Sequence, residues 1–295
     1  MLQRFLKPEV LASVSSLDLI AKTVVDGFVS GLHRSPDYGF SQEFAEYRPY
    51  TPGDDLRHVD WNVYARTERA YLKKYRGETN CQLTILLDAS ATMGAPAGGV
   101  SKIDYARYVA ASLAYLANQQ RDAAGLIVFD DEVRNYVPPS TRQGQLHRLL
   151  HGIEHAEPHA RTDYAKPFHH FQEAIKRRGI VVVLSDFFAD PEVIVKTVEP
   201  LRYRGNDIVL FHILHPLELR PRFDGPVILV DVETNESMEV TPAYAQEEYP
   251  AKIDAHVAEL QSRAKGAGMD YYLASTDKPL DGALREYLSI RQGRL

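Results

Sequence analysis

Ile180-Val-Val-Val-Leu-Ser-Asp186 is a run of five apolar residues that ends in a serine and an aspartate. Its counterpart earlier in the chain is Cys81-Gln-Leu-Thr-Ile-Leu-Leu-Asp88, which also ends in an aspartate. Apolar runs without polar alternation are typical of strands buried on both faces of a parallel sheet. Similar runs occupy 124–129 and 207–214, and segments with helical spacing lie between the runs. The pattern predicts an α/β fold with a doubly wound, mainly parallel sheet.

Around this sheet, the sequence predicts an N-terminal extension over 1–80 and a main domain over 81–295. Apolar residues between Val10 and Phe28 are spaced as in an amphipathic helix, and an aromatic, turn-rich stretch follows them. Within the main domain we expect a small hairpin insertion near 224–242. The helices expected there cover 102–119, 146–153, 167–176, 193–203, 244–265 and 279–290, and a last strand covers 270–274.

Composition narrows the class of protein. The 295 residues include 34 Lys and Arg against 40 Asp and Glu, and the net charge of −6 gives no basic footprint for nucleic acid. Cys81 is the single cysteine, which excludes an internal disulfide and a multi-cysteine zinc site. Nowhere do 18 apolar residues follow one another, and the first residues lack the apolar core of a secretory signal. We therefore expect a cytoplasmic protein without a membrane span.

Oxygen-bearing side chains gather where the predicted strands end. Ligands of open α/β sheets bind beyond the carboxyl ends of the strands, where the strand order reverses. Asp88 begins Asp88-Ala-Ser90-Ala-Thr92, in which alternate side chains project the same way, and Asp186 ends a second strand. Thr162 adds a hydroxyl from a loop before a helix. Such hard oxygen donors suit Mg²⁺ or Mn²⁺. The predicted ligands of this cation are Asp88, Ser90, Thr92, Thr162 and Asp186, with some waters left for a partner's carboxylate to replace.

This set resembles the metal-ion-dependent adhesion site of von Willebrand factor type A domains. In that site the third residue of the first motif is usually Ser, whereas this chain has Thr92, which keeps the hydroxyl. The resemblance implies a von Willebrand factor A, Rossmann-like fold. It also implies a non-enzymatic, metal-dependent protein-interaction module, without catalytic residues.

An upstream motif points to a more specific family. The segment from Tyr47 to Arg66 includes Gly53-Asp-Asp-Leu-Arg-His-Val-Asp-Trp61. It resembles the signature of the domain-of-unknown-function 58 family, in which this segment precedes a type A-like domain, and the resemblance spans nearly the whole chain. The family resemblance implies a MoxR-type AAA+ ATPase as partner, with this chain as its adaptor or co-chaperone.

Two other functions stay open. A Mg²⁺-dependent phosphohydrolase of haloacid dehalogenase type also has an aspartate at the end of its first strand and an acidic metal ligand on a later one. Its motif requires a second aspartate two residues on as general acid, where this chain has Ser90, and no lysine is clearly placed for the phosphate. The other alternative is a metal-free scaffold of the same fold.

Two further motifs have structural explanations that we favour. His151, His155 and His159 are spaced four apart, but Pro158 interrupts a helix before His159, so we expect surface or capping histidines and no zinc site. The Gly53–Trp61 motif is either a docking surface for the ATPase or, as we favour, a structural element. In that element Trp61 anchors the core, and arginine pairs with aspartate, the residues available being Asp54, Asp55, Arg57, Asp60 and Arg66.

Overall fold

The computed structural model describes residues 7–14, 16–32, 44–51, 59, 61–75, 81–95, 98–159, 164–175, 177–231 and 236–293. The chain divides into two compact units. The larger unit comprises Met1–Phe28 and Cys81–Leu295, and the smaller one is Val29–Asn80. The beginning of the predicted 1–80 extension therefore groups with the sheet.

A six-stranded sheet organises the larger unit. Its strands are β3 (Gln82–Asp88), β4 (Ala123–Phe129), β5 (Val133–Ser140), β6 (Ile180–Ser185), β7 (Asp207–Leu214) and β10 (Asp270–Ser275). They lie in the order β10-β7-β6-β3-β4-β5, and all neighbours are parallel except β4 and β5. The predicted doubly wound, mainly parallel α/β fold is confirmed.

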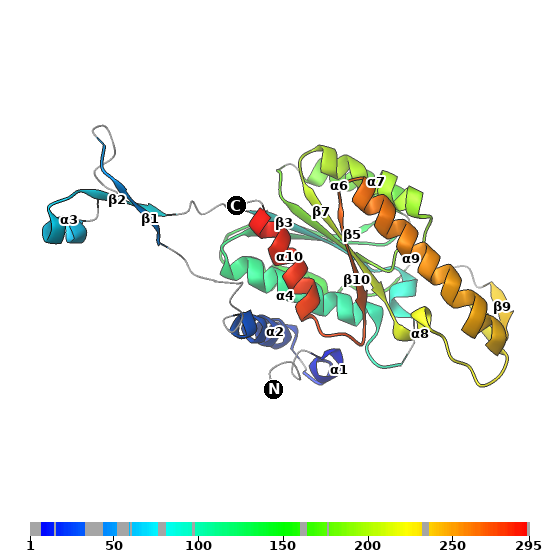
Figure 1. Ribbon diagram of the computed structural model, residues 1–295. Coiled ribbons are helices and arrows are strands. Elements are labelled where there is room, and N and C mark those ends of the chain that lie inside the picture. Colours follow the sequence, from blue (N-terminus) through cyan, green and yellow to red (C-terminus); the bar gives the residue numbers. More distant parts are fainter. Residues whose placement is uncertain are drawn as a thin grey trace. The chain divides into compact units, whose positions relative to one another are not determined.

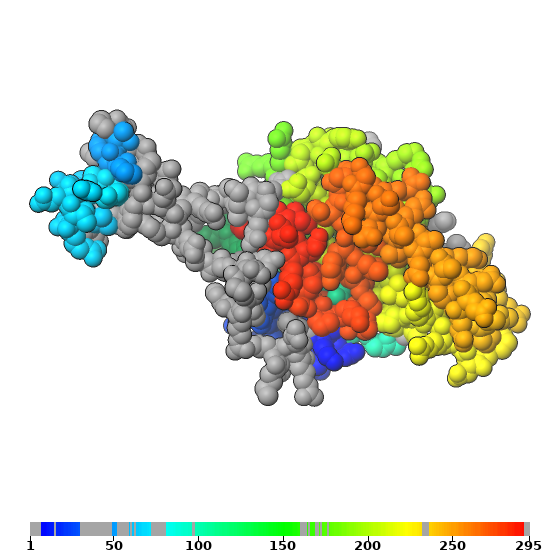
Figure 2. Space-filling model, viewed as in Figure 1, coloured from blue at the N-terminus to red at the C-terminus, as the bar shows by residue number. Residues whose placement is uncertain are grey.

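Helices cover both faces of the sheet (Figure 1). On one face lie α4 (Lys102–Gln119), α5 (Gln145–Glu154) and α10 (Asp281–Gly293). On the other lie α6 (Ala165–Ala174), α7 (Pro191–Tyr203) and α9 (Tyr249–Gly266). Figure 2 shows the surface of α9 in orange and that of α10 in red, and both helices pack against the edge strand β10. The short helical segments are η3 (Ala91–Gly94), α8 (Pro216–Leu219) and the π-helix η4 (Tyr244–Glu248).

The burial of the strands explains the sequence pattern. Every residue of β6 is buried, as is each residue of β3 and β4 after the first. At the edge, β5 instead alternates between half-buried and exposed residues. Under α6 and α7 an aromatic cluster fills the space, in which Phe129 makes edge-to-face contacts with Phe168 and Phe171. The central strands are thus held by apolar burial on both sides.

The N-terminal apolar stripe forms two helices where one was predicted. These are α1 (Pro8–Leu11) and α2 (Leu17–Leu32). Between them the Ser13 hydroxyl donates to the carbonyl of Val10 at 2.6 Å, which is the local competition that disfavours serine inside helices. Within the stripe, Leu11, Ile20, Val24 and Phe28 are buried in the larger unit, whereas Val10 is 39% exposed.

The predicted hairpin insertion consists of β8 (Val227–Val230) and β9 (Ser237–Val240), which pair in antiparallel fashion. Its turn, 232–235, lies outside the described residues. Four apolar side chains of the hairpin are exposed, namely Ile228, Leu229, Val230 and Met238. The hairpin therefore adds little to the core.

The smaller unit has a strand pair that sequence analysis did not predict. Its elements are β1 (Phe44–Pro49), β2 (Tyr71–Tyr75), antiparallel to β1, and α3 (Trp61–Thr67). Trp61 is 59% exposed and meets Tyr64 edge to face, so the prediction that it anchors a core is wrong. Residues 52–58 and 60, which hold the aspartates and Arg57 of the predicted ion pairs, lie outside the described residues.

Candidate metal site

The site lies at the point where the strand order reverses. From β3 the chain moves to β4 on one side of the sheet and later returns to β6 on the other side. Since β3 and β6 are parallel neighbours, with Leu87 opposite Leu184, the residues that follow these strands emerge at the same edge. Asp88 and Asp186 are therefore brought to the place where open α/β sheets bind ligands.

Asp88 is fully buried and accepts hydrogen bonds at both oxygens. Its Oδ1 accepts the backbone N–H of Ser90 at 2.8 Å, and its Oδ2 accepts the hydroxyl of Ser185 at 2.5 Å. The Ser185 oxygen in turn lies 2.8 Å from the Tyr164 hydroxyl and accepts the N–H of Phe187 at 3.0 Å. This network fixes the carboxylate at the end of β3.

The two hydroxyls of the first motif face each other. The oxygens Ser90 Oγ and Thr92 Oγ1 are 3.1 Å apart, and Ser90 is fully buried. The turn after Asp88, which leads into the 3-10 helix η3 (Ala91–Gly94), brings Ser90 and Thr92 together beside Asp88.

Asp186 has a cationic neighbour that sequence analysis missed. The ammonium of Lys102, at the start of α4, lies 2.8 Å from Asp186 Oδ2, and both side chains are almost fully buried. The same ammonium also contacts Oε1 of Glu218 in α8, 116 positions along the chain. Sequence analysis found no lysine clearly placed for the phosphate of a phosphohydrolase, whereas the structure places Lys102 beside Asp186.

The charges of this cluster do not balance. Among the described residues, the carboxylates of Asp88, Asp186 and Glu218 stand against the ammonium of Lys102, which gives −2 when all four groups are ionised. Burial and then the negative charge of Asp186 raise the pKa of Asp88 to about 7. Burial by itself lowers the pKa of Lys102, but the charges of Asp186 and Glu218 outweigh it, so the pKa lies above the ordinary value. The cluster favours an additional positive charge.

The donor set fits a hard divalent cation. An octahedral Mg²⁺ holds its ligands at about 2.0–2.1 Å, which places adjacent ligand oxygens about 2.9 Å apart. The 3.1 Å between Ser90 Oγ and Thr92 Oγ1 is close to this separation, although it equally suits a hydrogen bond between two hydroxyls. Thr162 lies outside the described residues, so its place relative to the other four is not part of this geometry.

Of the site residues that sequence analysis missed, only Ser185 could have been found from the sequence pattern. Ser185 directly precedes Asp186, and a polar residue inside an otherwise apolar strand end is visible in the pattern. Lys102 and Glu218 gave no such signal, because they meet only through the fold.

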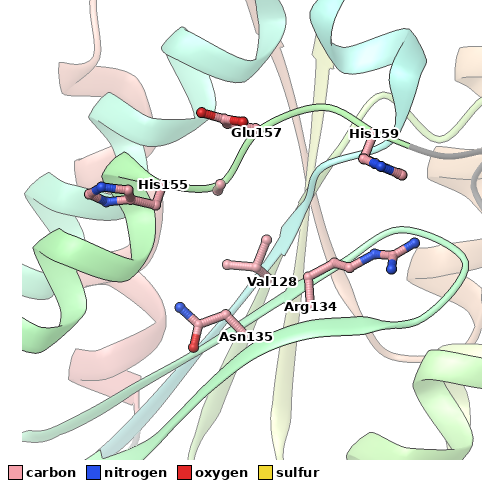
Figure 3. Close-up of a pocket in the computed structure, with 7 residues that line it drawn as sticks. Val128, Arg134, Asn135, His155, Glu157 and His159 are labelled. Atoms are coloured by element: carbon pink, nitrogen blue, oxygen red, sulfur yellow. The ribbon is translucent and has the colours of Figure 1, made fainter.

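Beside the first motif lies a small pocket of about 270 Å³ (Figure 3). Arg134 and Asn135 of β5 lie on one side, the 155–159 segment on the other, and Val128 between them. The N–H of His159 donates to the carbonyl of Ala89 at 3.1 Å, which joins this segment to the residue after Asp88. Arg134, the arginine among the described residues that line the pocket, is held by Asp130 and Asp131.

The histidines of the 151–159 segment are exposed, as predicted. The His151 and His155 rings are 4.2 Å apart, and His155 Nδ1 lies 2.9 Å from the carbonyl oxygen of His151. Across the described ranges no three residues of the types His, Cys, Asp and Glu group as a metal cluster. The predicted cation site, with two carboxylates and three hydroxyls, is of a different kind.

No described helix is long and apolar enough to cross a bilayer.

Comparisons with known proteins identify relatives of the whole chain. The family model described as "Protein of unknown function DUF58" matches residues 46–259, more than half of the sequence. "Uncharacterized protein Mb1516" of Mycobacterium bovis and "Uncharacterized protein Rv1480" of Mycobacterium tuberculosis are each 26% identical over 296 residues. The matches cover 98% of this chain and 92% of each relative.

Solved structures show likeness in fold. An aerotolerance-related membrane protein from Bacteroides fragilis is 15% identical over 70% of this chain and 97% of its own, with a TM-score of 0.50. The conserved hypothetical protein BatB from Bacteroides thetaiotaomicron is 14% identical over 72% of this chain and 99% of its own, with a TM-score of 0.47. The SpRpn10 VWA domain matches at 11% identity over 70% and 94%, with a TM-score of 0.40. None of these relatives or structures carries the name of an enzyme.

Proposed function

Since the chain belongs to the DUF58 family, we propose that it is a non-enzymatic, cytoplasmic protein-interaction module that binds its partner through a divalent cation. The cation is Mg²⁺ or Mn²⁺, and its ligands are Asp88, Ser90, Thr92, Thr162 and Asp186, some of them through water. When bound, the ion offers a coordination position to a carboxylate of the partner. The partner is a MoxR-type AAA+ ATPase, for which the chain acts as adaptor or co-chaperone.

One observation carries the proposal. Around the buried carboxylate of Asp88, the hydroxyls of Ser90 and Thr92 meet at 3.1 Å, within a cluster that has more carboxylates than cations. Oxygen donors with excess negative charge at the carboxyl edge of a parallel sheet suit a hard cation. In this site Asp88 supplies charge, and Ser185 and the Ser90 N–H hold its oxygens in place.

The experiment measures binding of the purified chain to a MoxR-type ATPase from the same genome, at a fixed Mg²⁺ concentration. Asp88→Ala should abolish binding while the chain stays folded, since the substitution removes a buried carboxylate and its repulsion with Asp186. A variant is preferable to a chelator, because a chelator also removes the ATPase's own metal. Asp254→Ala is the matched control, because Asp254 is an exposed carboxylate that pairs with Arg220. Unchanged binding by Asp88→Ala would reject the mechanism.

The phosphohydrolase alternative gains one element from the structure and lacks another. Lys102 places an ammonium beside the two aspartates, as a phosphate-binding lysine would be. However, Asp186 and Glu218 both bind the Lys102 ammonium, and the lysine is only 2% exposed. Ser90 also occupies the position where a phosphohydrolase has its general acid. A Mg²⁺-dependent phosphatase assay with a generic substrate separates the two functions: saturable turnover that Asp88→Asn abolishes would replace the interaction module by an enzyme.

A further inference from the structure

Lys102 is held between two acceptors that belong to different parts of the fold. Asp186 ends β6 at the centre of the sheet, whereas Glu218 belongs to α8, which follows β7. The ammonium contacts one oxygen of each. The ring of Phe188 lies beside it, 4.8 Å from Nζ to the ring centroid, and leaves the lysine only 2% exposed.

Glu218 is fixed in place independently of Lys102. Its Oε2 accepts the backbone N–H of His215 at 2.8 Å, so Glu218 and His215 form a capping box at the start of α8. His215 is itself anchored, since its Nε2 lies 2.9 Å from the carbonyl oxygen of Gly98. The ammonium therefore has a second, prepositioned carboxylate that remains available when the first is taken.

A cation at the proposed site would compete with the Lys102 ammonium for the Asp186 carboxylate. Lys102 is buried beside Asp186, the proposed ion would bind the same carboxylate, and repulsion between like charges is strong where water is excluded. The Phe188 N–H lies 3.4 Å from Asp186 Oδ1, a weak contact, while Oδ2 already accepts from Lys102.

We infer that Lys102 is an internal counter-cation that competes with the divalent ion for Asp186, and that Glu218 receives the ammonium when the ion binds. This inference rests on the proposed cation site. Lys102 is then a residue that sets the affinity of the site, by opposing the ion, and Phe188 and Glu218 keep it in position.

The test is a calorimetric titration of the full chain with MgCl₂ and, separately, MnCl₂. Lys102→Met should bind the ion about tenfold or more tightly than the wild type, because a buried positive charge beside the site is removed. Glu218→Gln should bind it more weakly, because one negative charge is lost and Lys102 is left with Asp186 alone. Lys196→Met, which removes an exposed ammonium that pairs with Glu192, should match the wild type.

If Lys102 competes with the ion, Lys102→Met raises the ion affinity and Glu218→Gln lowers it. If the ion pair is merely structural, its loss lowers the ion affinity in both variants. Lys102→Gln keeps an N–H donor without the charge and should change the affinity in the same direction as Lys102→Met, so misfolding of one variant does not decide the result. If the wild type binds the ion and neither Lys102 variant binds it more tightly, the inference is overturned and the cation site stands. If only the Lys102 variants bind, the inference holds and the wild-type cation site fails. Absence of binding in every variant overturns both.

Discussion

Ser185 donates a hydrogen bond to Asp88 between two central strands, from Oγ to Oδ2 at 2.5 Å, although the residues are 97 positions apart. The contact ties the end of β6 to the end of β3. It also makes Ser185 the residue that holds the carboxylate on which the proposed cation site depends, since an outer partner of this kind orients a metal ligand.

Ser185→Ala should weaken both the fold and the site. The substitution removes the hydroxyl that donates to the buried Asp88 carboxylate, which costs about 1–3 kcal/mol of unfolding free energy. Loss of an outer partner should also lower the affinity for Mg²⁺ by about 10–100-fold. Urea unfolding and calorimetry measure the two effects. Ser112→Ala is the control, because its hydroxyl is buried but donates to the Tyr108 carbonyl in α4. Equal Mg²⁺ affinity in wild type and Ser185→Ala would show that Ser185 does not position the carboxylate.

Protonation of Asp88 should make the stability of the metal-free protein depend on pH. Burial and the charge of Asp186 raise the pKa of Asp88 from 3.8 to about 7, so the folded chain binds this proton more tightly than the unfolded chain does. Stability from this group is therefore greatest below the unfolded pKa, falls as the pH rises through the window between the two values, and is constant above about 7. Asp88→Asn should remove this part of the slope in urea unfolding curves recorded in chelator between about pH 4 and pH 8.

Mg²⁺ should reverse that dependence, because the ion binds the ionised carboxylate and competes with the proton. Its affinity should rise by about tenfold between pH 6 and pH 8. Asp254→Asn, at an exposed position, should leave both pH profiles unchanged. A slope that persists in Asp88→Asn would assign the titration to another group.

Arg291 should stabilise the larger unit from its last helix. Its Nε donates to Asp122 Oδ2 at 2.8 Å, and Asp122, which is buried, also accepts the backbone N–H of Cys81. Arg291→Met leaves this carboxylate without its cation and should cost about 3 kcal/mol, toward the lower end for a broken buried pair. Combining it with Asp122→Asn should restore part of the loss, because the stranded charge is then gone. Unfolding curves of the two single variants and the double variant give the comparison, and additive losses would contradict the pairing.

Much of the fold could be predicted because helical spacing and apolar runs are properties of short stretches of sequence. The helix predicted over 102–119 has those limits in the structure, and the apolar runs that end in Asp88 and Asp186 are the central strands. The two N-terminal helices and the β1–β2 pair were not predicted in this form. In the first case the Ser13 side chain bonds to the backbone between the two helices, and in the second a short strand pair lies in an aromatic, turn-rich stretch.

The candidate site was accessible to sequence reasoning only in part. Alternation within Asp88-Ala-Ser90-Ala-Thr92 is a local property, and the structure brings its three polar side chains together. The contact of Lys102 with Asp186 and Glu218 depends on how α4, β6 and α8 meet, and spacing along the chain carries no information on that. The exposed Trp61 shows the same limit, since an aromatic residue in a motif does not by itself indicate burial.

Calorimetric titration of the wild type and Asp88→Ala with MgCl₂, accompanied by thermal unfolding, decides whether the oxygen atoms at the end of β3 hold a cation. We expect saturable binding to the wild type, with a gain of about 2.7 kcal/mol in unfolding free energy at a Mg²⁺ concentration 100 times the Kd. Asp88→Ala should show neither heat nor stabilisation. A wild type that gives no heat and no shift in melting temperature with either Mg²⁺ or Mn²⁺ would contradict the cation site and leave a metal-free scaffold of the same fold.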